Sequence, residues 1–463
     1  MNVRSKNLLK ACETLENNTS KDIKYRPKYH ISPKVGWLND PNGLCQYNGL
    51  YHIFYQYSPF DTKPGLNYWG HCTTKDFIHY EYHQPALCSD EKFDCHGVYS
   101  GSALVENGQM NIFYTGNVKQ VGNFNYITNG REHNLVKVTS KDGFTFNGKH
   151  LVMTNSDYPK DVTCHVRDPK VWKEDDTYYM VLGARRIDDV GEALIYQSSD
   201  LETWKLINRL TTKEKFGYMW ECPDIYNFND VKILAVSPQG VEPLGYKYNN
   251  IYQSGYFIID GNFKGEYKLS EFTELDNGFD FYAPQSFVDD NGRRILIGWL
   301  GLPDIDEYYS NPTKDWVHML TIPRELSFKD GKVHQQPLEE LKRLRKSTNN
   351  FMCSSERTFN IGTSFELIVE GLTNDFTIQL NDAIISYSEK VFKLEFGKSG
   401  MGRTFRAIQI DRVYKVQIFC DKSSLEIFLN DGENVLSSRF YPSDNIMDVT
   451  IKTNSADVKL FEI

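Results

Sequence analysis

The sequence predicts an all-β protein, a five-bladed β-propeller followed by a C-terminal β-sandwich. Three observations support this fold class. Tyr (29 residues) and Phe (28 residues) are abundant and aromatic residues make up 14% of the chain, which favours strands. A hairpin pattern recurs five times in the first two thirds of the chain, at intervals of about 60 residues. Short strands with alternating apolar residues then fill the C-terminal part.

Each repeat is a strand, a tight turn and a more apolar strand. The turns are predicted at Asn48-Gly49, Asn107-Gly108, Asp175-Asp176, Asn229-Asp230 and Asn291-Gly292. Asn-Gly between two β-rich runs predicts a type I′ turn, in which both central residues have positive φ. Five such units arranged radially form a propeller, because repetition protects the sheet edges. An irregular sandwich with coincidental hairpins is the alternative.

The 463 residues allow two or three domains. We expect an N-terminal extension over 1–24, the propeller as the catalytic domain over 25–335, a linker with a short helix over 336–350 and the sandwich over 351–463. The sandwich shows no catalytic cluster in its sequence, so we expect a structural or ancillary role for it.

Composition and charge exclude several classes of partner. The net charge of -9 and the absence of Lys/Arg runs argue against nucleic acid and anionic membrane surfaces. The N-terminus lacks the apolar core of a signal peptide, and no stretch approaches the roughly 20 apolar residues of a membrane span. We therefore expect a cytoplasmic protein. The nine cysteines form no C-x-x-C pair and are interpreted as free thiols.

Polar residues interrupt the strand pattern at the start of the first strand of each repeat. They are Asp40, Ser100 with Ser102, Asp168, Glu221, and Tyr282 with Gln285. In a propeller these strands line the central channel, so we expect these residues to be neighbours. Proline follows two of the aspartates directly and is expected to hold each in an extended backbone conformation. One Asp-Pro step is typical of a turn, but three acids at one equivalent position repel each other, which favours a functional origin.

At these residues the sequence resembles glycoside hydrolase family 32, the invertase and fructan-hydrolase family, and most closely its bacterial sucrose-6-phosphate hydrolase branch. The matching stretches are R-P-K-Y-H-I-S-P-K-V-G-W-L-N-D-P-N-G from Arg26, Y-S-G-S-A from Tyr99, R-D-P from Arg167, W-E-C-P-D from Trp220, Y-A-P-Q-S from Tyr282, G-W-L-G-L-P-D from Gly298 and L-T-I-P-R-E-L from Leu320. The family fold implied is a five-bladed propeller followed by a β-sandwich.

The resemblance implies a role for each acid. Asp40 is the expected nucleophile, Glu221 the general acid and then base, and Asp168 the transition-state stabiliser. The positions that match the family's sugar pocket are Asn39, Gln56, Trp69, Tyr99, Ser100, Arg167, Cys222, Tyr282 and Trp299. A retaining mechanism predicts about 5–5.5 Å between the carboxyl groups of nucleophile and acid, pKa values that are pushed apart, and an Arg167 that keeps its neighbour Asp168 charged.

The implied reaction releases fructose from sucrose or sucrose 6-phosphate, a small sugar substrate, and no metal or cofactor is expected. A substrate phosphate requires cationic groups at the pocket rim. The candidates are Arg185, Arg186, His165, Lys247 and Lys314, each of which also fits an ordinary surface charge. Residues 58–66 lack the tryptophan that family members often carry there, so the apolar wall beside fructose is expected to differ. A fructan exohydrolase, an arabinanase-like enzyme and a non-catalytic carbohydrate-binding propeller are the alternatives.

Overall fold

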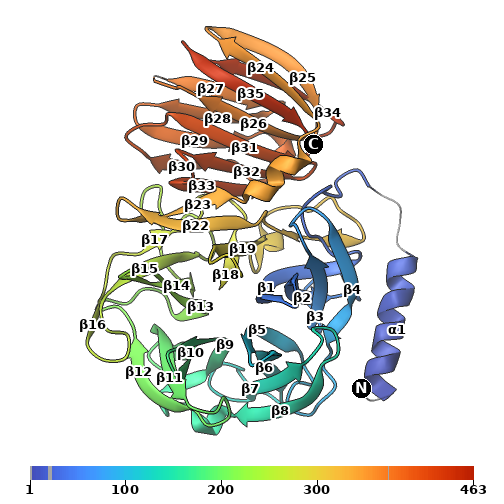
Figure 1. The fold of residues 1–463 in the computed structure, drawn as a ribbon, viewed down its shortest axis with the longest axis vertical. Coiled ribbons are helices and arrows are strands. Elements are labelled where there is room, and N and C mark those ends of the chain that lie inside the picture. Colours follow the sequence, from blue (N-terminus) through green and yellow to red (C-terminus); the bar gives the residue numbers. More distant parts are fainter. Residues whose placement is uncertain (1–2, 19–22, 374) are drawn as a thin grey trace.

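The computed structural model describes residues 3–18, 23–373 and 375–463, and it confirms the all-β prediction (Figure 1). The sequence analysis did not predict the N-terminal helix α1 (Val3–Asn17). This helix lies beside the first sheet, where Leu9 packs with Tyr68 and Cys88. Among the described residues, no helix is both long and apolar enough to cross a bilayer.

The described residues before the linker form five sheets, in which consecutive strands pair antiparallel. The first contains β1 (Gly36–Tyr47), β2 (Leu50–Ser58), β3 (Tyr68–Thr74), β4 (Tyr80–Leu87) and, parallel to β1, β20 (Trp316–Val317). The second contains β5 (Val98–Glu106), β6 (Gln109–Lys119), β7 (Arg131–Ser140) and β8 (Asn147–Met153). The third contains β9 (Val162–Glu174), β10 (Thr177–Arg186), β11 (Gly191–Ser198) and β12 (Lys205–Leu210).

The fourth contains β13 (Met219–Phe228), β14 (Val231–Gln239), β15 (Gly255–Gly261), β16 (Tyr267–Leu269) and β17 (Thr273–Glu274). The fifth contains β18 (Tyr282–Val288), β19 (Arg294–Leu300), β21 (Met319–Leu320), β22 (Arg324–Lys329) and β23 (Lys332–Pro337). Short 3-10 helices lie at Asn155–Asp157 (η1) and Ile305–Glu307 (η2). The first strands β1, β5, β9, β13 and β18 lie nearest the centre of the ring of sheets in Figure 1.

The hairpin turns follow the sequence prediction except in the fifth sheet. Asn48 and Gly49 have φ values of 50° and 75°, and Asn107 and Gly108 have 51° and 69°, as type I′ turns require. The type I′ prediction is wrong at 291–292, because only Gly292 has a positive φ (78°). There the connection spans 289–293, and the Asp289 carboxylate accepts the amides of residues 291 and 293 (3.1 and 2.8 Å), which stabilises a wider loop.

The C-terminal part consists of two six-stranded sheets in the described region. One contains β24 (Ser347–Cys353), β26 (Ser364–Glu370), β31 (Lys415–Asp421), β32 (Ser424–Leu429), β33 (Asn434–Arg439) and β35 (Ala456–Glu462). The other contains β25 (Glu356–Gly362), β27 (Phe376–Leu380), β28 (Ala383–Ser388), β29 (Val391–Phe396), β30 (Phe405–Gln409) and β34 (Ile446–Lys452), with η4 (Lys398–Gly400) between its last hairpin strands.

The two sheets pack face to face, since one apolar cluster joins Leu367 and Ile427 of the first to Ile378 and Val449 of the second. The predicted helical link is the 3-10 helix η3 (Glu339–Leu344), and β24 begins three residues after it.

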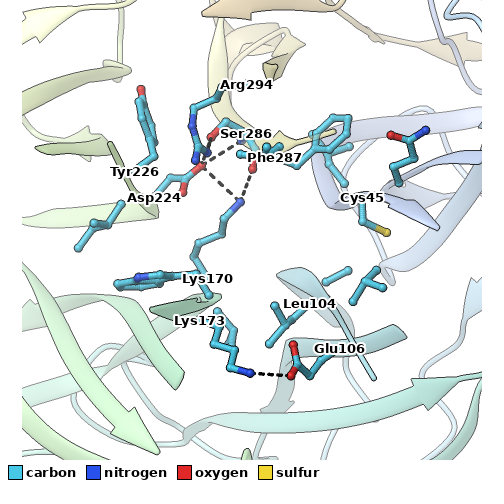
Figure 2. A pocket seen from close by; sticks show the side chains of 18 of the residues that line it. Cys45, Leu104, Glu106, Lys170, Lys173, Asp224, Tyr226, Ser286, Phe287 and Arg294 are labelled. Atoms are coloured by element: carbon cyan, nitrogen blue, oxygen red, sulfur yellow. Dashed lines mark hydrogen bonds and ion pairs between the residues drawn. The ribbon is translucent and has the colours of Figure 1, made fainter. Parts of the chain in front are cut away.

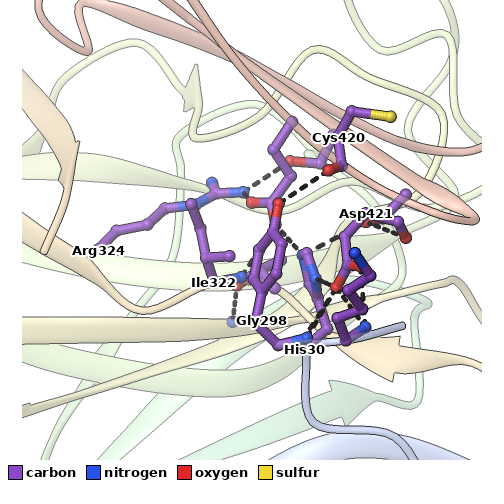
Figure 3. Close-up of polar contacts among 12 residues, drawn as sticks. His30, Gly298, Ile322, Arg324, Cys420 and Asp421 are labelled. Carbon is purple, nitrogen blue, oxygen red and sulfur yellow. Dashed lines mark hydrogen bonds and ion pairs between the residues drawn. The ribbon is translucent and has the colours of Figure 1, made fainter. Parts of the chain in front are cut away.

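A buried ionic network joins the segment before β1 to the C-terminal sheets (Figure 3). His30 Nδ1 lies 2.9 Å from Asp421 Oδ2, and its Nε2 lies 2.8 Å from Glu426 Oε1. Arg324 donates to the second oxygen of Glu426 (2.6 Å), and the backbone amide of Lys28 donates to Asp421 (2.8 Å). Burial alone would lower the pKa of His30, but its hydrogen bonds to the two carboxylates outweigh burial and raise the pKa to about 9.

A second buried cluster strengthens the same boundary. Asp280, just before β18, accepts hydrogen bonds from Arg403 (2.8 Å) and from Arg439 (3.0 Å) of the C-terminal sheets. Burial raises the pKa of Asp280, but the two guanidinium groups outweigh it and bring the pKa down to about 2. Breaking either network leaves a charge buried without its partner, which is strongly destabilising.

We predict that His30→Gln lowers the free energy of unfolding by roughly 3–5 kcal/mol near pH 6, because it removes the cation between two buried carboxylates. The pKa of His30 is higher in the folded state (about 9) than its ordinary value of 6.5. The stabilisation is therefore complete below about pH 6.5 and is lost as the pH rises through about 9. Urea unfolding at pH 6, 7.5 and 9 measures this difference.

His79→Gln is the matched control, since the His79 side chain is 80% exposed and pairs with Asp76 at the surface. It should cost less than about 1 kcal/mol. A His30→Gln deficit that stays constant or grows towards pH 9 contradicts the assignment.

Candidate active site

Within the described ranges, the first strand of each of the five sheets contains a β-bulge, in which two residues face one residue of the next strand. The bulge residues are Asn39 and Asp40 (β1), Tyr99 and Ser100 (β5), Asp168 and Pro169 (β9), Cys222 and Pro223 (β13), and Ala283 and Pro284 (β18). Arg167, Glu221 and Tyr282 directly precede three of these bulges. A bulge interrupts the ladder and re-aims side chains, so the predicted site residues occupy equivalent irregular positions in different sheets.

The extended conformation that we expected before proline is wrong for Asp168. Its φ is 63°, and Cys222 and Ala283, which also precede prolines, have φ values of 46° and 45°. All three are first residues of bulges, where the left-handed conformation lets two residues fit opposite one. The amide of Asp168 donates to Thr115 Oγ1 (3.0 Å), which helps hold this unfavourable backbone in place.

Asp40 lies half-buried among three hydrogen-bond donors. Ser100 Oγ donates to Asp40 Oδ2 at 2.6 Å, and the Cys222 thiol approaches the same oxygen at 3.6 Å. Asn39 Nδ2 lies 3.4 Å from the other carboxyl oxygen. The carboxyl group is thereby held by residues of β1, β5 and β13.

Cys222 connects two of the acids. Its backbone amide donates to Asp168 Oδ2 at 2.9 Å, while its thiol contacts Asp40. Burial raises the pKa of the Cys222 thiol well above its usual range, so the group remains a neutral donor. Asp40 and Asp168 are 128 positions apart in the chain, and both of their side chains contact Cys222.

Glu221 is held by four donor groups. Arg167 donates to its Oε1 through Nε (2.9 Å) and through Nη2. Tyr282 Oη (2.6 Å) and Gln239 Nε2 (2.8 Å) donate to Oε2. These donors come from β9, β14 and β18 and hold the Glu221 carboxyl group in one orientation.

Mutual repulsion and burial control the charge of the other two acids. Burial raises the pKa of Asp40 to about 7, with the charges of Asp168 and Glu221 adding to the increase and the Ser100 hydrogen bond opposing it. Burial likewise raises the pKa of Asp168 to about 6. The positive charge of Arg167, whose Nε lies 4.0 Å from Asp168 Oδ2, lowers the pKa of Asp168, as predicted, but does not cancel the increase.

The other predicted pocket residues lie behind or beside these acids. Gln56 is buried and donates to the Val98 carbonyl (3.0 Å), and Trp69 Nε1 donates to the Tyr99 carbonyl (3.0 Å), so both join the first two sheets. Trp299 is buried between the rings of Tyr282 and Trp37, with centroid distances of 6.3 and 6.1 Å. These residues position the bulges more than they line an open surface.

Sequence reasoning missed three contributors, namely Gln239, Thr115 and the orienting role of His165. Gln239 had no sequence signal, because the register that pairs Ser237 with Glu221, and so makes Gln239 a same-face neighbour, depends on the bulge at 222–223. His165 Nδ1 lies 2.6 Å from Arg167 Nη1 and fixes that guanidinium. No sequence signal marked this contact.

The remaining phosphate candidates behave as surface charges. Arg185 pairs with Asp189 and Arg186 with Asp188, each at 2.6 Å, and Lys247 and Lys314 are exposed. Among the described residues, no group of three or more His, Cys, Asp or Glu has the arrangement of a metal site.

The opposite ends of the same five strands line a cavity of about 580 Å³ (Figure 2). Lys170 lies 3.4 Å from Asp224, whose Oδ2 also accepts the Ser286 amide (3.0 Å) and hydroxyl (2.7 Å). This cluster ties β9, β13 and β18 together at the end away from the bulges. The far ends of the five first strands therefore surround one cavity.

Two carboxylates flanking a site, with a third acid and an arginine beside them, are typical of an enzyme that cleaves glycosidic bonds. Residues 30–337 match the N-terminal domain of glycosyl hydrolases family 32, and residues 344–463 match the C-terminal region of that family. The chain belongs to this family, as the sequence motifs predicted.

The chain is 40% identical over 454 residues to a sucrose-6-phosphate hydrolase of Bacillus subtilis, with 92% of this chain and 91% of that protein covered. It is 41% identical over 445 residues to a sucrose-6-phosphate hydrolase of Vibrio alginolyticus, covering 92% and 88%. A solved sucrose-6-phosphate hydrolase from Lactobacillus gasseri has a TM-score of 0.89 at 29% identity, covering 98% of this chain and 96% of that one. A Bombyx mori family 32 β-fructofuranosidase mutant in complex with sucrose has a TM-score of 0.86 at 30% identity, covering 100% and 98%.

We predict that Ser100→Ala raises the pKa of Asp40 further above its value of about 7, because the substitution removes the hydroxyl that donates to the ionised carboxylate. Such a bond contributes on the order of 1.5 kcal/mol, so the titration midpoint should rise by roughly one pH unit. A ¹³C NMR titration of protein with labelled aspartate carboxyls measures it, and Asp40→Asn assigns the signal. Ser102→Ala is the matched control, since Ser102 donates to the Pro169 carbonyl instead (2.8 Å). Equal midpoints in wild type and Ser100→Ala refute the prediction.

Proposed function

We propose that this protein hydrolyses the fructosyl bond of sucrose 6-phosphate by a double displacement, with Asp40 as nucleophile, Glu221 as general acid and base, and Asp168 as transition-state stabiliser. One observation carries the assignment. The three acids come from three sheets and are linked by Cys222, which contacts Asp168 (2.9 Å) and Asp40 (3.6 Å), and by Arg167, which contacts Glu221 (2.9 Å) and lies 4.0 Å from Asp168. Relatives named as sucrose-6-phosphate hydrolases support the reaction and its substrate.

In the first step Asp40 attacks the anomeric carbon of the fructosyl unit. The bond to the glucosyl oxygen breaks, and Glu221 gives that oxygen its proton. In the second step Glu221 takes a proton from water, the water oxygen attacks the same carbon, and Asp40 leaves as a carboxylate. Asp168, kept close by the Cys222 amide, stabilises the positive charge that develops on the fructosyl ring in both steps.

The free protein and the reacting complex place different demands on Asp40. Burial raises the pKa of Asp40 to about 7, so Asp40 is partly protonated at neutral pH when no sugar is bound. The proposed mechanism requires Asp40 to be ionised and Glu221 to hold a proton, so substrate binding must favour the ionised form of Asp40.

Two buried polar atoms beside the bulges are suited to bind the sugar. Asn39 Oδ1 and Gln285 Nε2 make no hydrogen bond to another described residue. Unsatisfied buried polar atoms are costly, and sugar hydroxyls would satisfy them. Phe60 is 45% exposed and packs edge-on against Tyr68 (ring centroids 6.1 Å apart), so it provides apolar surface in the segment that lacks a tryptophan.

The architecture supports this proposal at the level of the whole chain. We infer that the five N-terminal sheets are the five blades of one propeller over 25–335, and that the sandwich over 351–463 has a structural role. The single cavity lined by all five first strands supports a common axis. The buried pairs around His30 and Asp280 support a sandwich that is fixed rigidly to the fifth blade.

We predict that Asp40→Ala lowers kcat by roughly 10⁴-fold or more, because no other group can form the covalent intermediate. Glu221→Gln should lower kcat for sucrose 6-phosphate strongly. With an aryl fructoside, whose leaving group needs no proton, the variant should still release a rapid burst of phenol before slow turnover, because only the second step then lacks Glu221. Circular dichroism confirms folding, and Asp188→Asn at the surface serves as control.

Wild-type protein should release β-fructose first in NMR, as expected for carboxyl groups about 5–5.5 Å apart. Normal turnover in Asp40→Ala, or α-fructose as first product, contradicts the mechanism.

We also predict a higher kcat/KM for sucrose 6-phosphate than for sucrose, inulin-type trisaccharide or arabinan. Steady-state kinetics with the four substrates test this ranking at one pH and one ionic strength. Comparable values for sucrose and its 6-phosphate would remove the proposed preference and leave the hydrolysis itself in place.

A further inference from the structure

A group of cations next to the catalytic acids has no acidic partner. Lys119 ends β6, Arg131 begins β7, and the two residues pair directly across the antiparallel ladder. Like charges directly opposite each other are destabilising. Among the described residues, neither side chain forms an ion pair with a carboxylate, whereas Arg185 and Arg186 do so with Asp189 and Asp188.

His165 connects this pair to the active site. Its Nδ1 lies 2.6 Å from Arg167 Nη1 and therefore accepts that hydrogen bond. Its Nε2 then carries the ring hydrogen and donates to the Tyr126 carbonyl at 3.0 Å. Arg131 Nη1 lies 3.3 Å from the same Nε2, so two donors face each other there. Burial and both arginines lower the pKa of His165 to about 2, and the ring stays neutral.

Two further donors in this group are unsatisfied. Arg131 Nε is buried and makes no hydrogen bond to any described residue. His133 is completely buried, and neither of its ring nitrogens makes a hydrogen bond to any described residue. The His133 ring lies 5.6 Å from that of His165 and 5.8 Å from that of Tyr99. The group thus has surplus donors and surplus positive charge, in a protein with a net charge of -9.

The position of the group relative to Glu221 indicates which part of a substrate reaches it. Arg131, His165, Arg167 and Glu221 form a continuous series of contacts of 3.3, 2.6 and 2.9 Å. Glu221 protonates the oxygen of the departing glucosyl unit under the proposed function. A group carried by that unit, beyond the reacting oxygen, therefore lies on the side of Arg131.

We propose that Arg131 and Lys119, together with the ring N–H of His133, form the subsite for a phosphate ester on the leaving sugar. A phosphate dianion accepts charge-assisted hydrogen bonds from the guanidinium, relieves the repulsion between Lys119 and Arg131 and satisfies the buried donors. The partly exposed Arg131 and the exposed Lys119 are accessible from solvent. This inference rests on the proposed function, since the phosphate must be on the substrate for the subsite to act in catalysis.

The test compares kcat/KM for sucrose 6-phosphate and for sucrose in wild type, Arg131→Gln, Arg131→Lys and Lys119→Gln. We expect the ratio of the two values to fall roughly 10- to 100-fold in Arg131→Gln, since charged hydrogen bonds to phosphate are lost. It should fall less in Arg131→Lys, which keeps the charge, and several-fold in Lys119→Gln. Arg186→Gln is the matched control, and its ratio should equal that of wild type.

Inhibition distinguishes the source of the phosphate. Glucose 6-phosphate should inhibit sucrose hydrolysis by the wild type more strongly than glucose does, and Arg131→Gln should abolish this difference. Inorganic phosphate should inhibit weakly, because it lacks the sugar contacts. Stronger inhibition by inorganic phosphate than by glucose 6-phosphate overturns a subsite for a sugar ester.

The outcomes separate the two proposals. A wild type with equal kcat/KM for both substrates defeats the proposed substrate preference. A wild type that prefers sucrose 6-phosphate, with an unchanged ratio in both Arg131→Gln and Lys119→Gln, defeats the subsite and leaves the function in place. If Arg131→Gln does not fold, Lys119→Gln decides the matter, because its side chain is at the surface. An equal loss on both substrates in every variant assigns these residues a structural role only and overturns the subsite.

Discussion

The β-bulge near the start of each first strand is the constraint on which the site depends. A regular antiparallel ladder would place alternate residues on opposite faces and give every backbone group a partner. The bulges at residues 39–40, 168–169 and 222–223 break that alternation at equivalent places in three sheets. The freed backbone then finds other partners, as when the Cys222 amide donates to Asp168 and the Asp168 amide donates to Thr115. The same irregularity that exposes the acids also fixes them.

Each end of the first strands has its own group of charged residues. At one end, Arg167 donates to Glu221 and lies 4.0 Å from Asp168, and burial raises the pKa values of Asp40 and Asp168. At the other end, Lys170 and Asp224 neutralise each other and hold the strands together. A rigid far end allows the near end to carry an unfavourable charge arrangement, because repulsion between acids cannot be relieved by moving the strands apart. Strain of this kind is common where chemistry requires it.

The sequence predicted the repeats and the acids better than it predicted their surroundings. Turn chemistry is local, so Asn48-Gly49 and Asn107-Gly108 determine their own conformation and could be identified from two residues. The spacing of Asp40, Asp168 and Glu221 follows from the repeat. To predict that the three side chains lie close together, we needed only to assume that the repeats are arranged radially. The left-handed Asp168 contradicts the local preference of a residue before proline, because the tertiary bulge overrides it.

Contacts that depend on register or on distant segments could not be predicted. Gln239 reaches Glu221 through a strand pairing that only the structure defines. His30 and Asp421 are 391 positions apart, and nothing in a single sequence indicates that they are in contact. In both cases the missing information was spatial proximity and not residue type. Helix α1 is different, because Leu8, Leu9, Cys12 and Leu15 recur at helical spacing and the helix could have been predicted from them.

The network around His30 has a consequence for how such enzymes can be recombined. The segment that leads into β1 also provides the amides and the imidazole that Asp421 and Glu426 require. A chimera that joins this N-terminal part to the sandwich of a distant homologue would inherit one half of a buried ion cluster. A crossover in the linker separates positions 28–30 and 324 from positions 421 and 426, so it is compatible with folding only when both parents have matching residues at these positions.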